Sequence, residues 1–294
     1  MSNGLISFSA ISSVPCGTGQ ALSYQLLAKD MDLSIIIVNY RTANLVKNCV
    51  KRIKEFTRDL EYEIIVIDNG AHDKKVLGEL QSTKHPDIRL IFSSKNLGFG
   101  GGNNLAAKTA QGEYLMFINS DVYVIDNSIK VLVDFIRRNP TAGAAGPKLL
   151  NGDKSLQYTC CRFHKPLTPI FRRTFLGNTQ TGKKENDYHI YADWDHNSNQ
   201  EVDWVQGSCL IIPKKIFEKV GPFDNQFFMY FEDTDLCKRI WRAGYKVYYV
   251  ADAQMVHMHR KQSADKEGLG ALTNKITLFH ISSWFKYFLK WGFD

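Results

Sequence analysis

Four short apolar runs, separated by segments of helical character, constrain the fold of this chain more than any other feature. They read LSIIIV at residues 33–38, EIIVI at 63–67, IRLIF at 88–92 and YLMFI at 114–118. None of them alternates apolar with polar residues, so each strand should be buried on both faces, as in a parallel sheet covered by helices. The segment between the first two runs repeats apolar residues every three or four positions, as a helix packed on a sheet does. The order predicts an α/β fold.

Polar side chains follow three of these runs. Asn39 and Tyr40 follow the first, Asp68 and Asn69 the second, and Asn119 and Asp121 the fourth. In an open parallel sheet, ligands bind at the carboxyl ends of the strands, so we expect these side chains near a ligand. Asp121 could be a turn residue. A carboxylate there could also bind Mg²⁺ or Mn²⁺ that bridges a diphosphate.

A glycine-rich segment, NLGFGGGNN at residues 96–104, precedes the helical stretch LAAKTAQG. We interpret it as a loop that lets a ligand approach the backbone closely. Asn103 stands where the dinucleotide fingerprint G-x-G-x-x-G needs its last glycine, and the chain has no G-x-x-x-x-G-K-[ST]. The two common nucleotide-binding motifs are therefore excluded.

Two acidic residues, Glu232 and Asp233, begin a predicted helix inside a stretch crowded with phenylalanine and tyrosine. Acids at a helix start commonly do no more than complement the helix dipole. Carboxylates among aromatic rings are also partly desolvated, which raises their pKa and suits a general base. Both interpretations remain open at this point.

Two histidines, His257 and His259, alternate in the sequence Val-His-Met-His, so an extended backbone would place both on one face. A core or surface histidine is the ordinary interpretation. Imidazole is also a common metal ligand, and one of these histidines together with Asp121 would make a mixed nitrogen and oxygen site.

The net charge of +7 is compatible with nucleic acid, phosphorylated small molecules or an anionic membrane. The chain has no basic helix or recognised module for nucleic acid, so we exclude that partner. Its six cysteines are scattered without a C-x-x-C pair, which indicates a reducing cytoplasm. No apolar stretch is long enough to span a membrane, so any membrane contact should be peripheral.

The chain is predicted to divide into three parts. Residues 1–30 read as an extension of unknown role, and residues 31–263 as the folded domain, whose halves meet near residue 150. The second half opens with a long excursion that has few helix or strand signatures, and residues 154–184 hold seven basic residues and no acidic one. Residues 264–294 carry an apolar and aromatic stripe beside lysines. This predicts a helix that either closes the domain or lies on the inner membrane.

Taken in order, seven motifs form a pattern that none of them carries alone. They are IIIVNY, IIVIDNG, NLGFGGGNN, YLMFINSDV, VDWVQGSCLIIP, GPFDNQFFMYFEDTDLCKRIWRAGYKVYYV and VHMH. This succession, over about residues 32–263, resembles the family 2 glycosyltransferases, especially the bacterial rhamnosyltransferase-like branch.

The resemblance implies a GT-A fold, with a Rossmann-like, mostly parallel central sheet flanked by helices and a C-terminal helical segment. It implies inverting transfer of a sugar, rhamnose from dTDP-rhamnose, to a hydroxyl of a cell-surface polysaccharide or lipid-linked oligosaccharide precursor such as that of O-antigen. A UDP-hexose or UDP-N-acetylhexosamine donor is the alternative within the enzyme class. A nucleotide-sugar-binding protein without catalysis is the rival outside it.

The resemblance also assigns roles to residues. Asp233 would be the catalytic base, supported by Glu232, and Asp121 and His257 would bind a divalent metal, Mg²⁺ or Mn²⁺. The donor-binding residues would be Asn39, Asp68, Asn96, Gly98, Gly102, Asn103, Asn119 and Asp121. The acceptor-binding residues would be Trp204, Gly207, Phe228 and Tyr230. Asn119 replaces the first aspartate of a strict D-x-D motif, which leaves the metal requirement open.

Overall fold

The computed structural model describes residues 31–82, 88–258 and 275–292. The chain divides into two units, Met1–Asp30 and Met31–Asp294, and the description below is of the second unit by itself. The predicted extension at residues 1–30, and the second of the two histidines, His259, lie outside the described residues.

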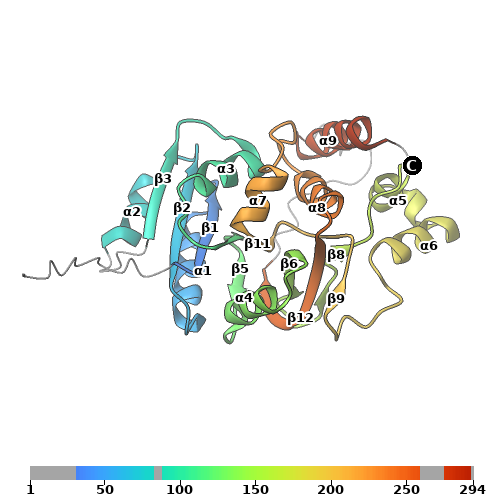
Figure 1. The fold of residues 1–294 in the computed structure, drawn as a ribbon. Helices are drawn as coiled ribbons and strands as arrows, with labels where there is room; N and C mark the ends of the chain where they lie inside the picture. Colours follow the sequence, from blue (N-terminus) through green and yellow to red (C-terminus); the bar gives the residue numbers. More distant parts are fainter. Residues whose placement is uncertain (1–30, 83–87, 259–274, 293–294) are drawn as a thin grey trace, which may run out of the picture. The chain divides into compact units, whose positions relative to one another are not determined.

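A ten-stranded sheet lies at the centre of this unit (Figure 1). Its strands are β1 (Leu33–Asn39), β2 (Tyr62–Asn69), β3 (Ile88–Ser93), β4 (Tyr114–Asn119), β5 (Val122–Val124), β6 (Ala142–Leu150), β7 (Leu156–Gln157), β9 (Gln200–Glu201), β11 (Cys209–Pro213) and β12 (Lys246–His257). The order along the sheet is β3-β2-β1-β4-β11-β6-β12-β5, with β7 beside β6 and β9 beside β12. Strands β3, β2, β1 and β4 are parallel, β11 is antiparallel to both of its neighbours, and β12 is parallel to β6. The mostly parallel sheet predicted from the sequence is therefore confirmed.

Helices cover both faces of the sheet. Helices α1 (Ala43–Phe56), α2 (Lys74–Ser82) and α4 (Ser128–Arg138) pack on one face, and α3 (Gly98–Ala107), α7 (Lys214–Val220) and α8 (Glu232–Arg242) on the other. Along β1, Ile35 and Ile37 join the first apolar cluster and Ile36 joins the second, and all three are fully buried. A strand with both faces covered needs apolar residues at every position, which explains the runs without alternation.

The glycine-rich segment differs from its prediction as a loop, because helix α3 begins within it, at Gly98. Its glycines permit close packing. A Cβ at Gly100 would lie 2.9 Å from Cβ of Phe223, and one at Gly102 would lie 3.2 Å from Nδ2 of Asn69. The low helix propensity of glycine is thus offset by the tight fit of α3 against its neighbours.

The excursion after residue 150 is more regular than its composition suggests. A two-stranded sheet pairs β8 (Cys160–Cys161) with β10 (Trp204–Val205), and between them lie α5 (Thr168–Arg173), the 3₁₀ helix η1 (Phe175–Asn178) and α6 (Gln180–His189). The sequence pattern did not predict these helices because they are short. The side-chain oxygens of Thr174 and Thr179 cap the first turns of η1 and α6.

The C-terminal helix α9 (Lys275–Trp291), red in Figure 1, packs beside α8 and the segment before it. Tyr287 and Phe288 of α9 are buried against Phe227 and Phe231. Ser283 Oγ donates to the carbonyl of Met229. The predicted helix is present, and one side of it closes the domain. Among the helices of the described residues, none combines the length and apolar character that crossing a bilayer requires.

Candidate active site

The ends of β1 and β2 bring Asn39 and Asp68 together, because the two residues are register partners in the parallel pair. Asn39 Nδ2 donates to Asp68 Oδ1 at 3.4 Å and to Asp73 Oδ2 at 3.1 Å. The Asp68 oxygens accept from the backbone N–H groups of Ala71 and Asp73, at 3.0 and 2.9 Å. Both predicted residues are buried, and what they hold in place is the loop that follows β2.

The first turn of α3 is tied to β2 by Asn69, a strand-end residue that was noted in the sequence but not included among the predicted donor-binding residues. Asn69 Nδ2 donates to Asn96 Oδ1 and to the carbonyl of Gly98, and Asn69 Oδ1 accepts from Leu97 N. Asn96 Oδ1 also accepts from the backbone N–H of Gly98 at 2.9 Å. The position of Asn69 directly after Asp68, at the end of an apolar run, was the available signal. Asn69 thus holds in place the turn that contains Asn96 and Gly98, two of the predicted donor-binding residues.

Further along α3, two consecutive asparagines make contacts within the chain. Asn103, predicted to bind donor, is buried and donates to the carbonyl of Phe99 at 3.1 Å. Asn104 donates to the carbonyl of Phe223 at 2.7 Å and accepts from its N–H at 3.0 Å. Together with the contact of Gly102 on Asn69, these bonds fix α3 between the sheet and the segment that leads to α8.

Asp121 and His257 meet because β5 pairs antiparallel with β12, with His257 opposite Val122. Asp121 Oδ1 lies 3.2 Å from His257 Nε2. The other ring nitrogen, Nδ1, lies 2.8 Å from Gln157 Oε1, while Gln157 Nε2 donates to Asn151 Oδ1. Since Gln157 uses its N–H₂ group there, its oxygen faces the ring, and Nδ1 is the nitrogen that donates.

This orientation turns Nε2 and a carboxylate oxygen toward each other, and two acceptors at that distance repel unless a proton or a cation lies between them. A hydrogen bond from the second ring nitrogen of a histidine is also the usual support of a metal-binding imidazole. The pair thus fits a divalent cation. No cluster of three or more histidine, cysteine, aspartate or glutamate side chains suited to a metal occurs among the described residues. Most ligands of such a cation would have to come from a bound substrate or water.

A strained backbone places Glu232 and Asp233 at the start of α8. Tyr230 and Phe231, directly before them, both have positive φ angles, 70° and 68°. Bulky residues rarely adopt this conformation, and such strain is concentrated at functional sites. Asp233 Oδ2 accepts from the N–H of Gly207 at 2.9 Å, and Asp233 Oδ1 accepts from that of Thr234 at 2.8 Å.

The electrostatics separate the two carboxyl groups. Burial, and next the charge of Asp233, raise the pKa of Glu232 well above its ordinary value. Burial also raises the pKa of Asp233, but the N–H groups of Gly207 and Thr234 oppose that shift. Two adjacent carboxyl groups do not readily ionise together, and the two N–H bonds favour the ionised form of Asp233 over that of the buried Glu232. Asp233 is therefore the group equipped to accept a proton.

The four predicted acceptor-binding residues differ in their contacts, and Gly207 is the one shown to bond Asp233. Trp204 is largely buried, and its ring N–H donates to the carbonyl of Arg162 at 2.9 Å. A Cβ at Gly207 would come within 3.0 Å of the Phe99 ring, so glycine allows its N–H to reach Asp233. The carbonyl of Phe228 accepts from Phe99 N, which joins the segment before α8 to α3, and Tyr230 carries the strained backbone.

Backbone pairing links the two halves of the candidate site. Strand β11 is antiparallel to β4, and the N–H of Asn119 donates to the carbonyl of Ser208 at 2.9 Å. Ser208 follows Gly207, whose N–H reaches Asp233. The predicted residue Asn119 thus adjoins the strand end that also holds Asp233. Since Asn119 lies two residues before Asp121, the hydrogen bond from Asn119 to Ser208 joins the segment of Asp121 to the segment that bonds Asp233.

Comparison with known sequences gives two family matches. Residues 34–220 match the family described as "Glycosyl transferase family 2", and residues 167–291 match "Glycosyl transferase family group 2". The chain is 28% identical over 254 residues to the N-acetylglucosaminyl-diphospho-decaprenol L-rhamnosyltransferase of Mycobacterium tuberculosis, covering 78% of each chain. It is 26% identical over 260 residues to the rhamnosyltransferase WbbL of Escherichia coli K12, covering 86% of this chain and 91% of that one.

Two solved structures have a fold similar to that of this chain. GalNAc-T7 with UDP, GalNAc and Mn²⁺ matches 80% of this chain with a TM-score of 0.62 and 18% identity. The mannosyltransferase PcManGT of Pyrobaculum calidifontis, in complex with GDP-Man and Mn²⁺, matches 78% with a TM-score of 0.54 and 17% identity. The chain spans only 45% and 57% of the lengths of these two structures.

Proposed function

The chain belongs to glycosyl transferase family 2, and we propose that it transfers rhamnose from dTDP-rhamnose to a hydroxyl group of a lipid-linked saccharide, with inversion at the anomeric carbon. The observation that carries the proposal is the carboxyl pair at the start of α8, in which Asp233 accepts from the N–H groups of Gly207 and Thr234 beside the buried Glu232. The names of the relatives in Mycobacterium tuberculosis and Escherichia coli support rhamnose as the sugar, and the first of them supports a lipid diphosphate acceptor. Such a reaction would take place at the cytoplasmic face of a membrane, with the enzyme bound peripherally.

The proposed reaction is a single displacement. Asp233 accepts the proton of the acceptor hydroxyl, the oxygen of that hydroxyl forms a bond to the anomeric carbon, and the bond from that carbon to the diphosphate breaks. The nucleoside diphosphate leaves with the bonding electrons from the opposite face of the sugar. Gly207 N and Thr234 N hold the Asp233 carboxylate in position for the transfer.

The donor would bind at the ends of β1, β2 and β4, as ligands of open α/β sheets generally do. The loop that Asn39 and Asp68 hold, and the first turn of α3 that includes Asn96 and Gly98, would position the nucleotide. Gly102, Asn103 and Asn119 would act by fixing the packing beneath it.

Asp121 and His257 would hold a divalent metal, Mg²⁺ or Mn²⁺. The metal would supply positive charge to stabilise the leaving diphosphate. Asp121 is partly exposed while His257 is buried, so the carboxylate faces the open side of the pair.

The decisive variant for the base is Asp233→Asn, which keeps the shape of the side chain and removes its ability to accept a proton. We expect it to fold and to bind dTDP-rhamnose while transfer slows by about 100- to 10,000-fold, the usual contribution of a general base. The assay is transfer to a synthetic lipid-diphosphate N-acetylglucosamine acceptor, with donor binding followed by thermal shift. A panel of dTDP-, UDP- and GDP-sugars identifies the donor. Turnover near that of the unaltered protein would remove Asp233 from the role.

The metal proposal is tested separately with Asp121→Ala. We expect this variant to bind dTDP-rhamnose more weakly than the unaltered protein when Mn²⁺ is present, and equally when EDTA is present. Asp126→Ala is the matched control, because Asp126 lies five residues away, in the turn between β5 and α4. An Asp121→Ala variant whose donor binding responds to Mn²⁺ as strongly as that of the unaltered protein would exclude the assigned metal ligand.

A further inference from the structure

Exposed apolar side chains are concentrated in one region of the described residues. Over all the described residues, twelve large apolar side chains are exposed, and eight of these twelve belong to residues 167–188 or to helix α9. The other four are scattered singly, as on ordinary protein surfaces. A concentration of this kind indicates an interaction surface.

Within α9 the exposed side chains form a stripe. Leu278, Ile281, Phe285 and Leu289 follow one another at intervals of three, four and four residues, which places them on one face of the helix. Their exposed fractions are 52%, 37%, 53% and 79%. The opposite face, with Ser283 and Tyr287, is buried. The exposed stripe is therefore not needed to hold α9 on the domain.

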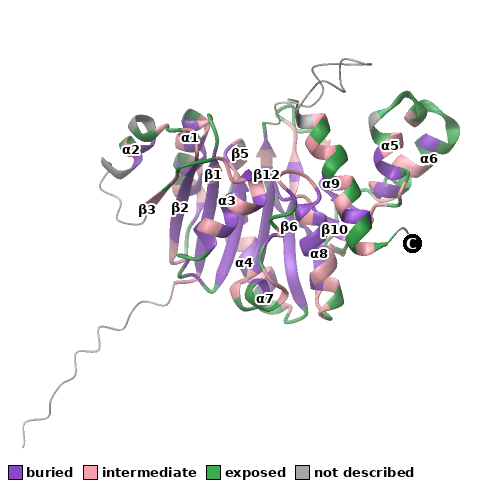
Figure 2. Cartoon of the chain, turned by 90° about the horizontal axis from the view of Figure 1, so that it is seen from above, coloured by how far each residue is buried: buried purple, intermediate pink, exposed green. Residues whose placement is uncertain are grey.

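The stripe continues onto the segment before α5. Trp284 Nε1 donates to the carbonyl of Pro166 at 3.2 Å, and the rings of Trp284 and Phe285 are 4.5 Å apart. Leu167, the residue after Pro166, is 56% exposed. Figure 2 shows α9 beside the α5–α6 hairpin, each with exposed residues. We call Leu167, Leu278, Ile281, Phe285 and Leu289 together the apolar face.

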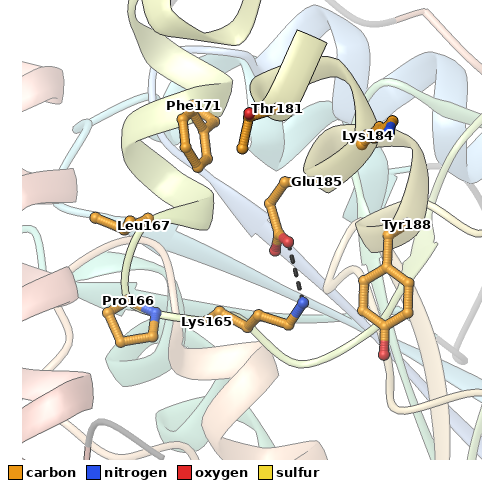
Figure 3. Close-up of a pocket in the computed structure, with 8 residues that line it drawn as sticks. All are labelled: Lys165, Pro166, Leu167, Phe171, Thr181, Lys184, Glu185 and Tyr188. Carbon is orange, nitrogen blue, oxygen red and sulfur yellow. Dashed lines mark hydrogen bonds and ion pairs between the residues drawn. The ribbon is translucent and has the colours of Figure 1, made fainter. Parts of the chain in front are cut away.

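Basic residues predominate next to the apolar face, and Glu185 is the acidic residue in the lining of the adjoining groove. Helix α9 contains no acidic residue, and neither do residues 154–184. A groove of about 740 Å³ between α5 and α6 is lined by Leu167 and Phe171 and carries Lys165 and Lys184 at its sides (Figure 3). Lys184 is exposed, whereas Lys165 forms an ion pair with Glu185, with 3.0 Å between Lys165 Nζ and Glu185 Oε2. Apolar side chains flanked by cations match the boundary between the acyl chains and the headgroups of anionic lipids.

We propose that the apolar face docks on an anionic lipid bilayer. The inference deepens the proposed function and rests on its lipid-linked acceptor. The helix that carries the face also bonds the segment before the catalytic pair, through Ser283 to Met229 and Lys286 to Gln226. Docking therefore sets Glu232 and Asp233 a short distance from the bilayer, where a lipid-bound saccharide is presented.

The test is flotation of the full chain with vesicles of phosphatidylcholine alone or mixed with phosphatidylglycerol, without donor or acceptor. We expect binding to the mixed vesicles at least tenfold tighter than to phosphatidylcholine, and weaker at high salt. The double variant Phe285→Ser/Leu289→Ser should bind the mixed vesicles at least tenfold more weakly, because two apolar anchors are lost. Phe92→Ser is the matched control, since Phe92 is 43% exposed and lies on β3, far along the sheet from β12.

Far-ultraviolet circular dichroism and the dTDP-induced thermal shift establish that the double variant is folded. Binding of this folded variant equal to that of the unaltered protein would overturn the inference, as would binding of the unaltered protein to neither vesicle. A stable dimer that does not bind vesicles would assign the apolar face to a second copy of the chain and would overturn it equally. Vesicle binding needs no turnover, so a protein that binds lipid and transfers no sugar would refute only the proposed function.

Discussion

Asp235 joins the C-terminal helix α9 to α8, the helix that carries the proposed base. Its side chain is fully buried, accepts from Arg239 Nε at 2.9 Å and from Trp291 Nε1 at 2.8 Å, and forms an ion pair with Lys290 Nζ at 2.7 Å. Removing one partner of a buried ion pair costs about 3–5 kcal/mol, because the other charge stays buried.

Asp235→Asn should therefore lower the free energy of unfolding by about 3 kcal/mol, the low end of that range. We take the lower value because Lys290 and Arg239 each keep other hydrogen-bonding partners in the Asp235→Asn variant. Lys290 retains Asp224 at 2.7 Å, and Arg239 retains the carbonyls of Val220 and Pro222. For a unit of this size, a loss of 3 kcal/mol lowers the melting temperature by roughly 6–12 °C.

The assay is thermal and urea unfolding of the two single variants Asp235→Asn and Lys290→Met and of the double variant. A coupling energy of about 1–3 kcal/mol is expected for a direct contact. Asp224→Asn is the matched control, because Asp224 contacts the same Lys290 Nζ at the same distance but is about one-third exposed. It should cost less than about 1 kcal/mol. Equal losses for Asp224→Asn and Asp235→Asn would refute the reasoning that burial makes the Asp235 contact strong.

Two further variants test the local conformation and the protonation at the candidate site. Gly98→Ala should destabilise the protein by more than about 1 kcal/mol and weaken the dTDP-induced thermal shift, because φ is 76° and a Cβ would lie 2.2 Å from the carbonyl oxygen of Phe228. Gly244→Ala is its control, with φ 85° and open space around the Cβ, and a loss as large as that of Gly98→Ala would contradict the packing argument. Glu232→Gln tests the raised pKa of Glu232. Above about pH 4.3 the unfolded state releases the Glu232 proton, whereas a raised pKa keeps that proton bound in the native state. The free energy of unfolding of the unaltered protein should therefore fall relative to that of the variant as pH rises. The two melting temperatures, measured from pH 4 to 8, should differ least at the acid end, and a difference that is constant with pH would show that Glu232 is not protonated in the folded protein.

The part of the fold that the sequence predicts well is the part fixed by local pattern. The first four apolar runs became adjacent strands because strands buried on both faces have a distinctive composition. Asn39 and Asp68, which end the first two runs, lie together because the carboxyl ends of neighbouring parallel strands meet at one edge.

What the sequence does not predict depends on contacts between distant segments. The helical state of Gly98 to Gly102 results from packing against Phe223 and Asn69, which override the propensity of glycine. The bonds of Asn104 to Phe223 span 119 residues, and no local pattern reports them. The cations that pair with Asp235 were also beyond reach, because Lys290 belongs to a helix separated from it by a long stretch of chain.

These distant contacts converge on the segment from Phe223 to Phe231, which leads into Glu232 and Asp233. On one side, α3 holds it through Asn104 and through the bond from Phe99 N to the carbonyl of Phe228. On the other side, α9 holds it through Ser283 and Lys286. The strained backbone at Phe231 persists only if its surroundings fix it from several directions. The position of Asp233 therefore depends both on the helix that begins at the proposed donor loop and on the helix that carries the apolar face.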